Sequence, residues 1–434
     1  MTGQIKIGIV GLWHLGAVLC AAWSKLGFEV IGFDYSKSLI NSLGLNQPPI
    51  FEPHLQETLA NSKEENRLMF ADEIALLSDC DFVFLAYDTP LLDDDSSNLI
   101  PLEKAIEDLG NVLKDHALVI VSSQTPVGTC GNFRSSLQAK NHTVELAYSP
   151  ENLRLGQAIE CYLKPGRIII GADTSAAESK AVSLFGNIEA ELITMSLASA
   201  EMVKHGINAF LANSIVFANH LADLCEACGA NILDVVKGVK SDDRIGLKAY
   251  LSAGIGFSGG TLGRDLKILA ELNRKTRQKA FLYESLQRFN SERKDIILDK
   301  VTRLLDGKLS GKTIGVLGLT YKPGTSTLRR SLPIEIIKSL VNKGAKVKAY
   351  DPKADYDELE GERVFKMCTS IDDAISESDL VLLLTEWSEF REYNWENGLN
   401  LMKNNRLFDA KNSLVDMELS EKGYRYSGIG FANI

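Results

Sequence analysis

The stretch Ile7–Leu12 (IGIVGL) decides the fold of this chain, because its pattern returns much later as Ile314–Leu319 (IGVLGL). Each is a short β-branched run that ends in glycine. Each is followed by a helical stretch and then by a second apolar run ending in an acid, Val30–Asp34 (VIGFD) and Val347–Asp351 (VKAYD) respectively. Short apolar strands that alternate with amphipathic helices are typical of βαβ units on a parallel sheet. The sequence therefore predicts an α/β protein with two Rossmann-like parallel-sheet domains.

A third matched pair supports the duplication and helps to divide the chain. Ser78–Leu85 (SDCDFVFL) corresponds to Ser376–Leu383 (SESDLVLL). Between the repeats, apolar residues from Glu201 to Ala227 recur every three or four positions, which indicates a long helix. We therefore expect three domains: a Rossmann-like domain at 1–195, a central helical linker or dimerisation domain at 196–300, and a second Rossmann-like domain at 301–434. We expect the chemistry in the cleft between the two Rossmann-like domains.

Composition narrows the class of protein. The chain has 434 residues and a net charge of −10, which argues against nucleic acid or an anionic membrane as the main partner. No apolar run reaches the roughly 20 residues that a membrane span needs, and the N-terminus lacks the features of a signal peptide. Seven scattered cysteines indicate reduced thiols in a cytoplasmic protein. Cys225 and Cys228 form a lone CxxC without a second ligand pair, so we expect both to be helix packing residues rather than zinc ligands.

A nucleotide-binding loop follows the first strand. Gly11–Gly16 (GLWHLG) keeps the first and third glycines of the GxGxxG fingerprint, and a helix opening at Gly16 directs its N-terminus at a pyrophosphate. The middle glycine, which lets the pyrophosphate approach the backbone, is replaced by Trp13. Asp34 stands where an acid binds the ribose hydroxyls and favours NAD over NADP. The loop predicts bound NAD, and the alternative is a fold kept with its cofactor site lost or reshaped.

Several downstream stretches resemble motifs of the UDP-glucose/GDP-mannose dehydrogenase family, the NAD-dependent nucleotide-sugar 6-dehydrogenases. The resemblance is collinear over nearly the whole chain. The matching stretches are 149–156 (SPENLRLG), 200–211 (AEMVKHGINAFL), 243–246 (DRIG), 254–257 (GIGF), 318–325 (GLTYKPGT) followed by Arg329 and Ser331, and 384–387 (LTEW) followed by Phe390.

The resemblance implies a reaction and also two departures from it. Family members oxidise a hydroxymethyl group twice with two NAD, through an aldehyde to a carboxylate, and the second step uses a thiohemiacetal on a cysteine in GGSCFPKD. The corresponding stretch here is SGGTLGRD, in which Thr261 takes the cysteine position and Arg264 the lysine position, while Asp265 is kept. Gln124 takes the place of a threonine that orients a catalytic water in the family.

Carried over residue by residue, the resemblance implies three groups of site residues and no metal. The catalytic group is Glu151, Lys204, Asn208 and Asp265, with Thr261 at the cysteine position but not acting as a nucleophile. The cofactor-binding group is Gly11, Trp13, His14, Leu15, Gly16, Asp34, Thr89 and Gln124. The substrate-binding group is Asn152, Leu153, Arg154, Arg244, Tyr250, Gly256, Phe257, Gly259, Lys322 and Arg329.

Replacement of the cysteine by Thr261 has a direct chemical consequence. A thiol with a pKa of about 8.5 supplies some thiolate at neutral pH, whereas a threonine hydroxyl needs a strong adjacent base. The remaining groups suit one hydride transfer: Lys204 to stabilise an alkoxide, Asn208 to hold water, and two carboxylates to accept protons. We therefore expect an NAD-dependent oxidoreductase acting on the CH–OH group of a nucleotide sugar, with a UDP-sugar favoured, in polysaccharide precursor synthesis. It stops after one oxidation, oxidises the aldehyde as its hydrate, or acts on a nucleotide sugar other than UDP-glucose.

Other interpretations of the same residues stand beside these. Lys204 and Asn208 would form a structural polar pair, Glu151 would be a helix N-terminal residue, and His14 would face solvent. The basic side chains of the loops would be ordinary solvated charges: Arg244, Arg264, Lys322 and Arg329. At the level of function, the alternatives are a non-catalytic nucleotide-sugar-binding or regulatory paralogue and a small hydroxyacid dehydrogenase. The long apolar helix favours a homodimer.

Overall fold

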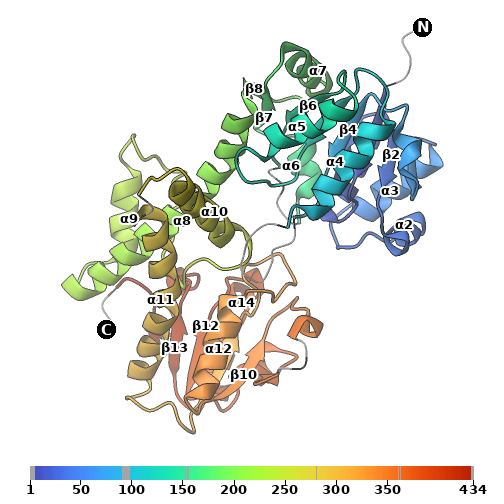
Figure 1. Cartoon of the computed structure of the whole chain (residues 1–434). Helices are drawn as coiled ribbons and strands as arrows, with labels where there is room; N and C mark the ends of the chain where they lie inside the picture. Colours follow the sequence, from blue (N-terminus) through green and yellow to red (C-terminus); the bar gives the residue numbers. More distant parts are fainter. Residues whose placement is uncertain are drawn as a thin grey trace. The chain divides into compact units, whose positions relative to one another are not determined.

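The structure is a computed structural model, and it describes residues 5–89, 98–151, 153, 156–279, 281–359, 361 and 363–431. The chain forms two compact units, Met1–Gly206 and Ile207–Ile434, which we call the N-terminal and the C-terminal unit. Figure 1 shows that each unit contains a sheet with helices packed around it. The predicted fold class, an α/β protein with two Rossmann-like sheets and a long central helix, is confirmed.

The N-terminal unit is built on an eight-stranded sheet with the order β3-β2-β1-β4-β5-β6-β7-β8. All neighbouring strands are parallel except β6 and β7, which are antiparallel. The strands are β1 (Lys6–Val10), β2 (Glu29–Phe33), β3 (Leu68–Ala71), β4 (Phe82–Leu85), β5 (Leu118–Val121), β6 (Glu145–Tyr148), β7 (Arg167–Ala172) and β8 (Glu191–Met195). The helices are α1 (His14–Lys25), α2 (Lys37–Gly44), α3 (Leu55–Glu64), α4 (Ile100–Val112), α5 (Thr129–Lys140), α6 (Ala158–Leu163) and α7 (Ser175–Phe185), with a 3-10 turn at Ile74–Leu77.

The C-terminal unit joins a helical region to a six-stranded parallel sheet with the order β11-β10-β9-β12-β13-β14. Helix α8 (Leu197–Cys228) is continuous across the boundary of the two units. The other helices are α9 (Ile232–Lys240), α10 (Thr261–Lys275), α11 (Phe281–Leu304), α12 (Leu332–Asn342), α13 (Ile371–Ile375), α14 (Ser388–Glu392) and α15 (Trp395–Leu401), with 3-10 turns at Tyr356–Leu359 and Val415–Met417. The strands are β9 (Thr313–Leu317), β10 (Lys346–Tyr350), β11 (Lys366–Met367), β12 (Leu380–Leu383), β13 (Arg406–Asp409) and β14 (Arg425–Ser427).

The predicted internal repeat is confirmed at the level of single hydrogen bonds. Gly11 and Gly318 both adopt φ of 89°, and each donates its N–H to the last residue of the neighbouring strand, at 3.0 and 2.9 Å. Asp81 accepts a hydrogen bond from the N–H of the first residue of β1, and Asp379 accepts one from the first residue of β9, both at 2.9 Å. The two strand–turn units are therefore built in the same way.

The core of each unit lies on both faces of its sheet. In β1, Ile7 and Ile9 pack into one hydrophobic cluster and Val10 into another. The equivalent β9 residues divide in the same way, since Ile314 and Val316 face one cluster and Leu317 the other. Because helices cover both faces, these strands are continuous apolar runs rather than alternating ones.

Three further expectations concern thiols, metals and membranes. All seven cysteines are free. Cys225 is buried in the core, but Cys228 is exposed at the end of α8, so the expectation that both pack is wrong for Cys228. Within the described ranges, no cluster of histidine, cysteine and carboxylate side chains is arranged to hold a metal ion. No helix in the described part of the chain is both long and apolar enough to span a bilayer.

Candidate cofactor and substrate sites

Both glycines of the Gly11–Gly16 loop, which stand at the first and third glycine positions of the fingerprint, are required by the backbone geometry. Gly11 has a positive φ of 89°, a conformation that L side chains rarely adopt. A Cβ atom at Gly16 would lie 1.8 Å from the carbonyl oxygen of Gly11, which no side chain can tolerate. The two glycines therefore fix a tight turn that leads directly from β1 into α1, as in a phosphate-binding loop.

Trp13 occupies the N-cap of α1. Helix α1 therefore begins at His14, two residues before the start predicted at Gly16. Its φ of −65° is open to any residue, so the loop keeps its fold without a glycine there. The indole is 48% exposed, and the N-terminus of α1 follows directly. Leu15 is buried in the core, and its backbone N–H, like that of His14, contacts the carboxylate of Asp88 at the N-terminus of α1.

His14 does not face solvent, which corrects that interpretation. Its side chain is only 12% exposed, and its Nε2 lies 3.1 Å from Glu52 Oε2. Glu52 is itself buried and accepts hydrogen bonds from the N–H groups of Gly156 at 3.0 Å and Ala158 at 2.8 Å. Glu52 therefore joins the first turn of α1 to the start of α6, a role that its sequence neighbourhood does not reveal.

Asp34 ends β2 beside the glycine turn. It is 8% exposed and accepts hydrogen bonds from the N–H groups of Leu12 and Ser36, both at 2.8 Å. A carboxylate has about four acceptor positions, so Asp34 retains capacity for ribose hydroxyls. This fits the role expected for the acid of a dinucleotide-binding loop.

Tyr87 lies against the same turn and was not predicted. Its ring would meet a Cβ atom at Gly11 at 2.9 Å. Its hydroxyl is buried and makes no hydrogen bond to the described residues. Burial raises the pKa of Tyr87, and the nearby carboxylates of Asp34 and Asp108 raise it further. A buried hydroxyl without a partner is costly, so Tyr87, which lies near Asp34, is a candidate contact for a ligand.

The second strand–turn unit lacks this free capacity. Asp351, the equivalent of Asp34, accepts hydrogen bonds from the N–H groups of Leu319, Thr320, Lys353 and Ala354, at 2.7, 3.0, 2.9 and 3.0 Å. The Thr320 hydroxyl and the Trp387 indole N–H also donate to it, at 3.1 Å each. Its acceptor positions are filled by the protein, so the C-terminal repeat keeps the fold without an acid available for a dinucleotide ribose.

Thr89 and Gln124, both predicted in the cofactor group, are adjacent: the Thr89 hydroxyl donates to the Gln124 carbonyl at 2.8 Å. The residue after Gln124 is held by two buried groups of α8. Glu201 accepts from the Thr125 hydroxyl at 3.3 Å, and His205 Nε2 lies 2.9 Å from the Thr125 carbonyl.

Glu201 is 0% exposed and also accepts from two N–H groups at the start of α5, those of Gly128 at 2.6 Å and Cys130 at 2.8 Å. Sequence reasoning missed Glu201 and His205, because a polar residue on an apolar helix does not reveal which distant loop it holds.

Glu151 and Lys204, both predicted to be catalytic, form an ion pair in the N-terminal unit. Lys204 is 8% exposed, and its ammonium lies 3.1 Å from Glu151 Oε1 and donates to the Glu151 carbonyl at 2.7 Å. Glu151 follows β6, and the next helix starts at Ala158, so its interpretation as a helix N-terminal residue is wrong. Glu151 Oε2 accepts from the Leu153 N–H at 2.8 Å, while the Leu153 side chain packs on the core. Asn152 and Arg154 lie outside the described residues.

Asn208 and Asp265 form a second pair in the C-terminal unit. Asn208 donates from Nδ2 to Asp265 Oδ2, and both residues are buried, at 7% and 0% exposed. The interpretation of Lys204 and Asn208 as partners of each other is therefore replaced by two separate pairs. Thr261 is exposed at the first position of α10, one turn before Asp265. A group at that position receives the favourable potential of a helix N-terminus.

The remaining substrate candidates divide between one ordered loop and exposed side chains. Gly256 has a φ of 103°, and the Phe257 backbone is bound by Asn290. Gly259 donates its N–H to the Arg330 carbonyl at 3.0 Å. Two of the other candidates form ion pairs: Arg244 with Asp242 at 2.7 Å and Arg329 with Glu358 at 3.4 Å. Tyr250 is 53% exposed. The Lys322 ammonium lies 5.7 Å from the centre of the Tyr321 ring.

Comparison with protein families gives matches along most of the chain. Residues 5–189 match the NAD binding domain of the UDP-glucose/GDP-mannose dehydrogenase family, residues 198–292 match its central domain, and residues 315–416 match its UDP binding domain.

Individual relatives agree with these matches over most of their lengths. The chain is 34% identical over 433 residues to a UDP-glucose 6-dehydrogenase of Rickettsia bellii. The aligned region covers 98% of this chain and 99% of the relative. It is 32% identical over 431 residues to the UDP-glucose 6-dehydrogenase TuaD of Bacillus subtilis, covering 98% and 93%. Among solved structures, a UDP-glucose dehydrogenase from Pyrobaculum islandicum superposes with a TM-score of 0.89 at 27% identity, covering 100% of this chain and 99% of that one.

Proposed function

Because the chain belongs to the UDP-glucose/GDP-mannose dehydrogenase family, whose members are NAD-binding nucleotide-sugar dehydrogenases, we propose that it oxidises the CH–OH group of a nucleotide sugar once rather than twice. The observation that carries this proposal is Thr261. It begins α10, one turn before the buried Asp265, at the position where the sequence resemblance puts the cysteine nucleophile. A hydroxyl there lacks the acidity of a thiol, so capture of an aldehyde as a covalent adduct is disfavoured.

The side chains that remain suit a single oxidation. The alcohol must lose a hydride from carbon and a proton from oxygen, and NAD, when bound, supplies the hydride acceptor. We assign stabilisation of the developing alkoxide to the Lys204 ammonium, which is buried and already oriented by Glu151. We assign the proton to Glu151 or, through a water held by Asn208, to Asp265.

The N-terminal unit is the proposed place of the dinucleotide. The turn at Gly11 and Gly16 opens the N-terminus of α1, and Asp34 keeps acceptor positions for ribose hydroxyls. Trp13 takes the place of the glycine that permits the closest approach, so we assign it a stacking contact with the cofactor rather than a blocking one. Its exposed indole supports this assignment.

We propose a UDP-sugar as the substrate, because residues 315–416 match the UDP binding domain of the family. The proposed division of the chain remains 1–195 for NAD, 196–300 for the helical linker and 301–434 for the nucleotide sugar. We also propose that the protein acts in the cytoplasm, where nucleotide sugars are made.

A homodimer through α8 completes the proposal. Three of its large apolar side chains are exposed at intervals of seven residues: Phe210 at 67%, Phe217 at 50% and Leu224 at 53%. Side chains seven apart lie on one helix face, and large apolar side chains that recur along an exposed face are typical of a surface that becomes buried on association. A second copy of the chain offers the same face.

A screen of UDP-, GDP- and dTDP-sugars with NAD, followed by the absorbance of the reduced nicotinamide, tests the enzyme. We expect turnover with at least one UDP-sugar. No turnover with any of them contradicts the proposal and favours the second candidate, a regulatory paralogue that binds nucleotide sugars without redox chemistry. The observation that favours this rival is Trp13 at the close-approach position. Calorimetry separates the two, because the rival binds UDP-sugar but not NAD.

A further inference from the structure

Both ends of the loop Gly254–Phe257 are held by side chains on their backbone N–H and C=O groups. At Gly254, the N–H donates to Asn219 Oδ1 at 2.7 Å, and the carbonyl accepts from Arg293 Nε at 3.0 Å. At Phe257, the N–H donates to Asn290 Oδ1 at 2.8 Å, and the carbonyl accepts from Asn290 Nδ2 at 2.9 Å. A loop of four residues is thus bound at four backbone groups by only three side chains.

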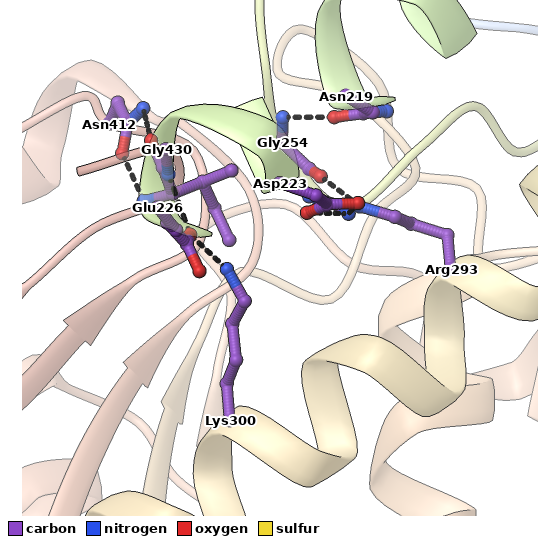
Figure 2. A network of polar contacts seen from close by, with 9 residues as sticks. Asn219, Asp223, Glu226, Gly254, Arg293, Lys300, Asn412 and Gly430 are labelled. Atoms are coloured by element: carbon purple, nitrogen blue, oxygen red, sulfur yellow. Dashed lines mark hydrogen bonds and ion pairs between the residues drawn. The ribbon is translucent and has the colours of Figure 1, made fainter. Parts of the chain in front are cut away.

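These side chains come from two helices that bracket the loop. Asn219 belongs to α8, while Asn290 and Arg293 belong to α11. Figure 2 shows the Asn219 side chain at the N–H of Gly254 and the Arg293 side chain at its carbonyl. The loop backbone also lies directly against its surroundings: a Cβ atom at Gly256 would lie 2.7 Å from Asn290 Oδ1, and one at Gly254 would lie 3.3 Å from the Ala410 carbonyl. The glycines and the polar side chains therefore fit one another closely.

Arg293, which binds the Gly254 carbonyl, is a charged side chain whose burial costs free energy. Its side chain is 0% exposed, and Asp223 binds its Nη1 with both carboxylate oxygens, at 2.6 and 2.7 Å. Its Nη2 is buried and makes no hydrogen bond within the described part of the chain. A buried ion pair is often no more stabilising than apolar residues of the same size, so stability alone does not account for it. The contact of its Nε with the Gly254 carbonyl fixes the orientation of that carbonyl.

The two helices that hold the loop, α8 and α11, make further polar contacts along their length. Glu226 of α8 accepts from the Gly430 N–H at 2.8 Å and is paired with Lys300 of α11. Asn412 exchanges two hydrogen bonds with the backbone of Ile429, both at 2.8 Å. Figure 2 shows these contacts beside the Arg293 pair, within one polar network. The helices that hold the loop are therefore themselves held against the C-terminal segment.

We propose that Asn219, Asn290 and Arg293 are positioning residues that hold the Gly254–Phe257 loop in its substrate-binding form before the nucleotide sugar arrives. The inference rests on the proposed function in assigning this loop to the nucleotide sugar. A loop that is already ordered does not lose conformational freedom on binding, which strengthens binding without any new contact. Helix α10, which follows the loop, is held separately by the Asn208–Asp265 pair, so the chemical step depends less on the three residues.

The two asparagines offer contrasting substitutions. Asn219 uses only its oxygen, so Asn219→Asp keeps the contact and Asn219→Leu removes it. Asn290 uses both its oxygen and its nitrogen, so Asn290→Asp loses the donor and places a carboxylate against the Phe257 carbonyl. Asn400→Leu is the matched control, because Asn400 is an exposed residue that bonds only weakly to its own helix, at 3.5 Å.

The experiment measures the dissociation constants of UDP-glucose, UDP and NAD by calorimetry, with KM and kcat where turnover is found and the melting temperature of each variant. Since one hydrogen bond contributes about 1 kcal/mol, which is roughly a fivefold change, we expect Asn219→Leu to weaken UDP and UDP-glucose about fivefold and Asn290→Asp about tenfold or more. Asn219→Asp restores binding to within about twofold, and Asn400→Leu matches the unaltered chain. The constants for NAD do not change, and KM rises while kcat changes little.

Three results would overturn the proposal. The first is unchanged UDP binding in Asn219→Leu and Asn290→Asp. The second is an equal loss of UDP and NAD binding that follows the loss of melting temperature, which indicates a purely structural role. The third is failure of Asn219→Asp to bind better than Asn219→Leu. If the unaltered chain binds NAD but neither UDP nor UDP-glucose, the proposed substrate is wrong and the positioning role falls with it.

Discussion

Asp34 and Asp351 end equivalent strands of the two repeats, yet only Asp34 keeps acceptor positions free for a ligand. Asp34 accepts hydrogen bonds from two backbone N–H groups, whereas Asp351 accepts from four backbone N–H groups and two side chains. The duplication thus gives two similar sheets with different uses of the same residue. In the N-terminal unit, Asp34 can still accept hydrogen bonds from a ribose. In the C-terminal unit, Asp351 binds the backbone and side chains of its own turn and its neighbours.

This difference predicts opposite effects of one substitution at the two positions. Asp34→Asn should weaken NAD binding about tenfold or more, because a charged hydrogen bond to a ribose hydroxyl contributes about 1.5–3 kcal/mol. Asp351→Asn should lower the melting temperature and leave NAD binding unchanged. Calorimetry with NAD and thermal unfolding of both variants provide the check. Loss of NAD binding in Asp351→Asn would show that the second repeat takes part in holding the cofactor.

Gly16→Ala should abolish NAD binding and destabilise the N-terminal unit. The added Cβ atom would lie 1.8 Å from the Gly11 carbonyl oxygen, so the turn must open. Gly44→Ala is the control, because a Cβ atom there meets nothing within 4 Å and the residue does not have a positive φ. We expect the control to melt at or slightly above the temperature of the unaltered chain. A Gly16→Ala protein that still bound NAD would remove the loop from the cofactor site.

Tyr87→Phe should make the free protein slightly more stable and should weaken its binding of ADP-ribose. The substitution removes a buried hydroxyl that has no described partner, which relieves a desolvation cost of about 1 kcal/mol. It also removes a donor beside Asp34, so ADP-ribose should bind about fivefold more weakly while nicotinamide mononucleotide is unaffected. If the unaltered chain binds ADP-ribose and Tyr87→Phe binds it equally well, the Tyr87 hydroxyl does not contact the cofactor.

Thr261→Cys should not by itself create a two-step enzyme. A thiol at the first position of α10 benefits from the helix dipole and should react readily with a disulfide reagent, which checks that it is accessible. Trp13 and Gln124 still differ from the family pattern, so we expect the reduced nicotinamide formed per sugar to stay near one. Thr261→Ser serves as the control without a thiol at this position, so that the reaction of the exposed Cys228 can be subtracted. Complete conversion to the acid by the cysteine variant would contradict this expectation.

Phe217→Asp should convert the proposed dimer to a monomer. The substitution places a charge in the middle of the exposed apolar face of α8. Leu76→Asp provides a control, because Leu76 is 45% exposed but lies outside α8. Sedimentation at tens of micromolar protein should give half the mass for Phe217→Asp only. Equal masses for Phe217→Asp and the unaltered chain would place any interface elsewhere.

The repeat could be predicted from the sequence because its signals are local. The apolar runs, their terminal glycines and the acids that follow them lie within a few residues of one another, and the structure adds the matching hydrogen bonds of Gly11 and Gly318. The long helix α8 was likewise visible in the spacing of its apolar residues. Local patterns therefore sufficed for the sheets and for the central helix.

The partners of buried polar residues could not be predicted in this way. Glu52 binds His14 and the start of α6, and Glu201 binds the start of α5, across sequence separations of 38 to 106 residues. Nothing in the residues around either glutamate identifies the distant N–H groups. For the same reason the sequence left open whether Lys204 and Asn208 pair with each other, which the separate contacts with Glu151 and Asp265 resolve.

The most direct test of the account is the number of reduced nicotinamides formed for each UDP-sugar consumed by the unaltered chain, with the product identified by mass. We predict one per sugar and an aldehyde or its hydrate as the product, because Thr261 does not supply a thiolate for the second step. Two per sugar with a carboxylate product would contradict the account, since the chain would then complete both oxidations without a cysteine at that position.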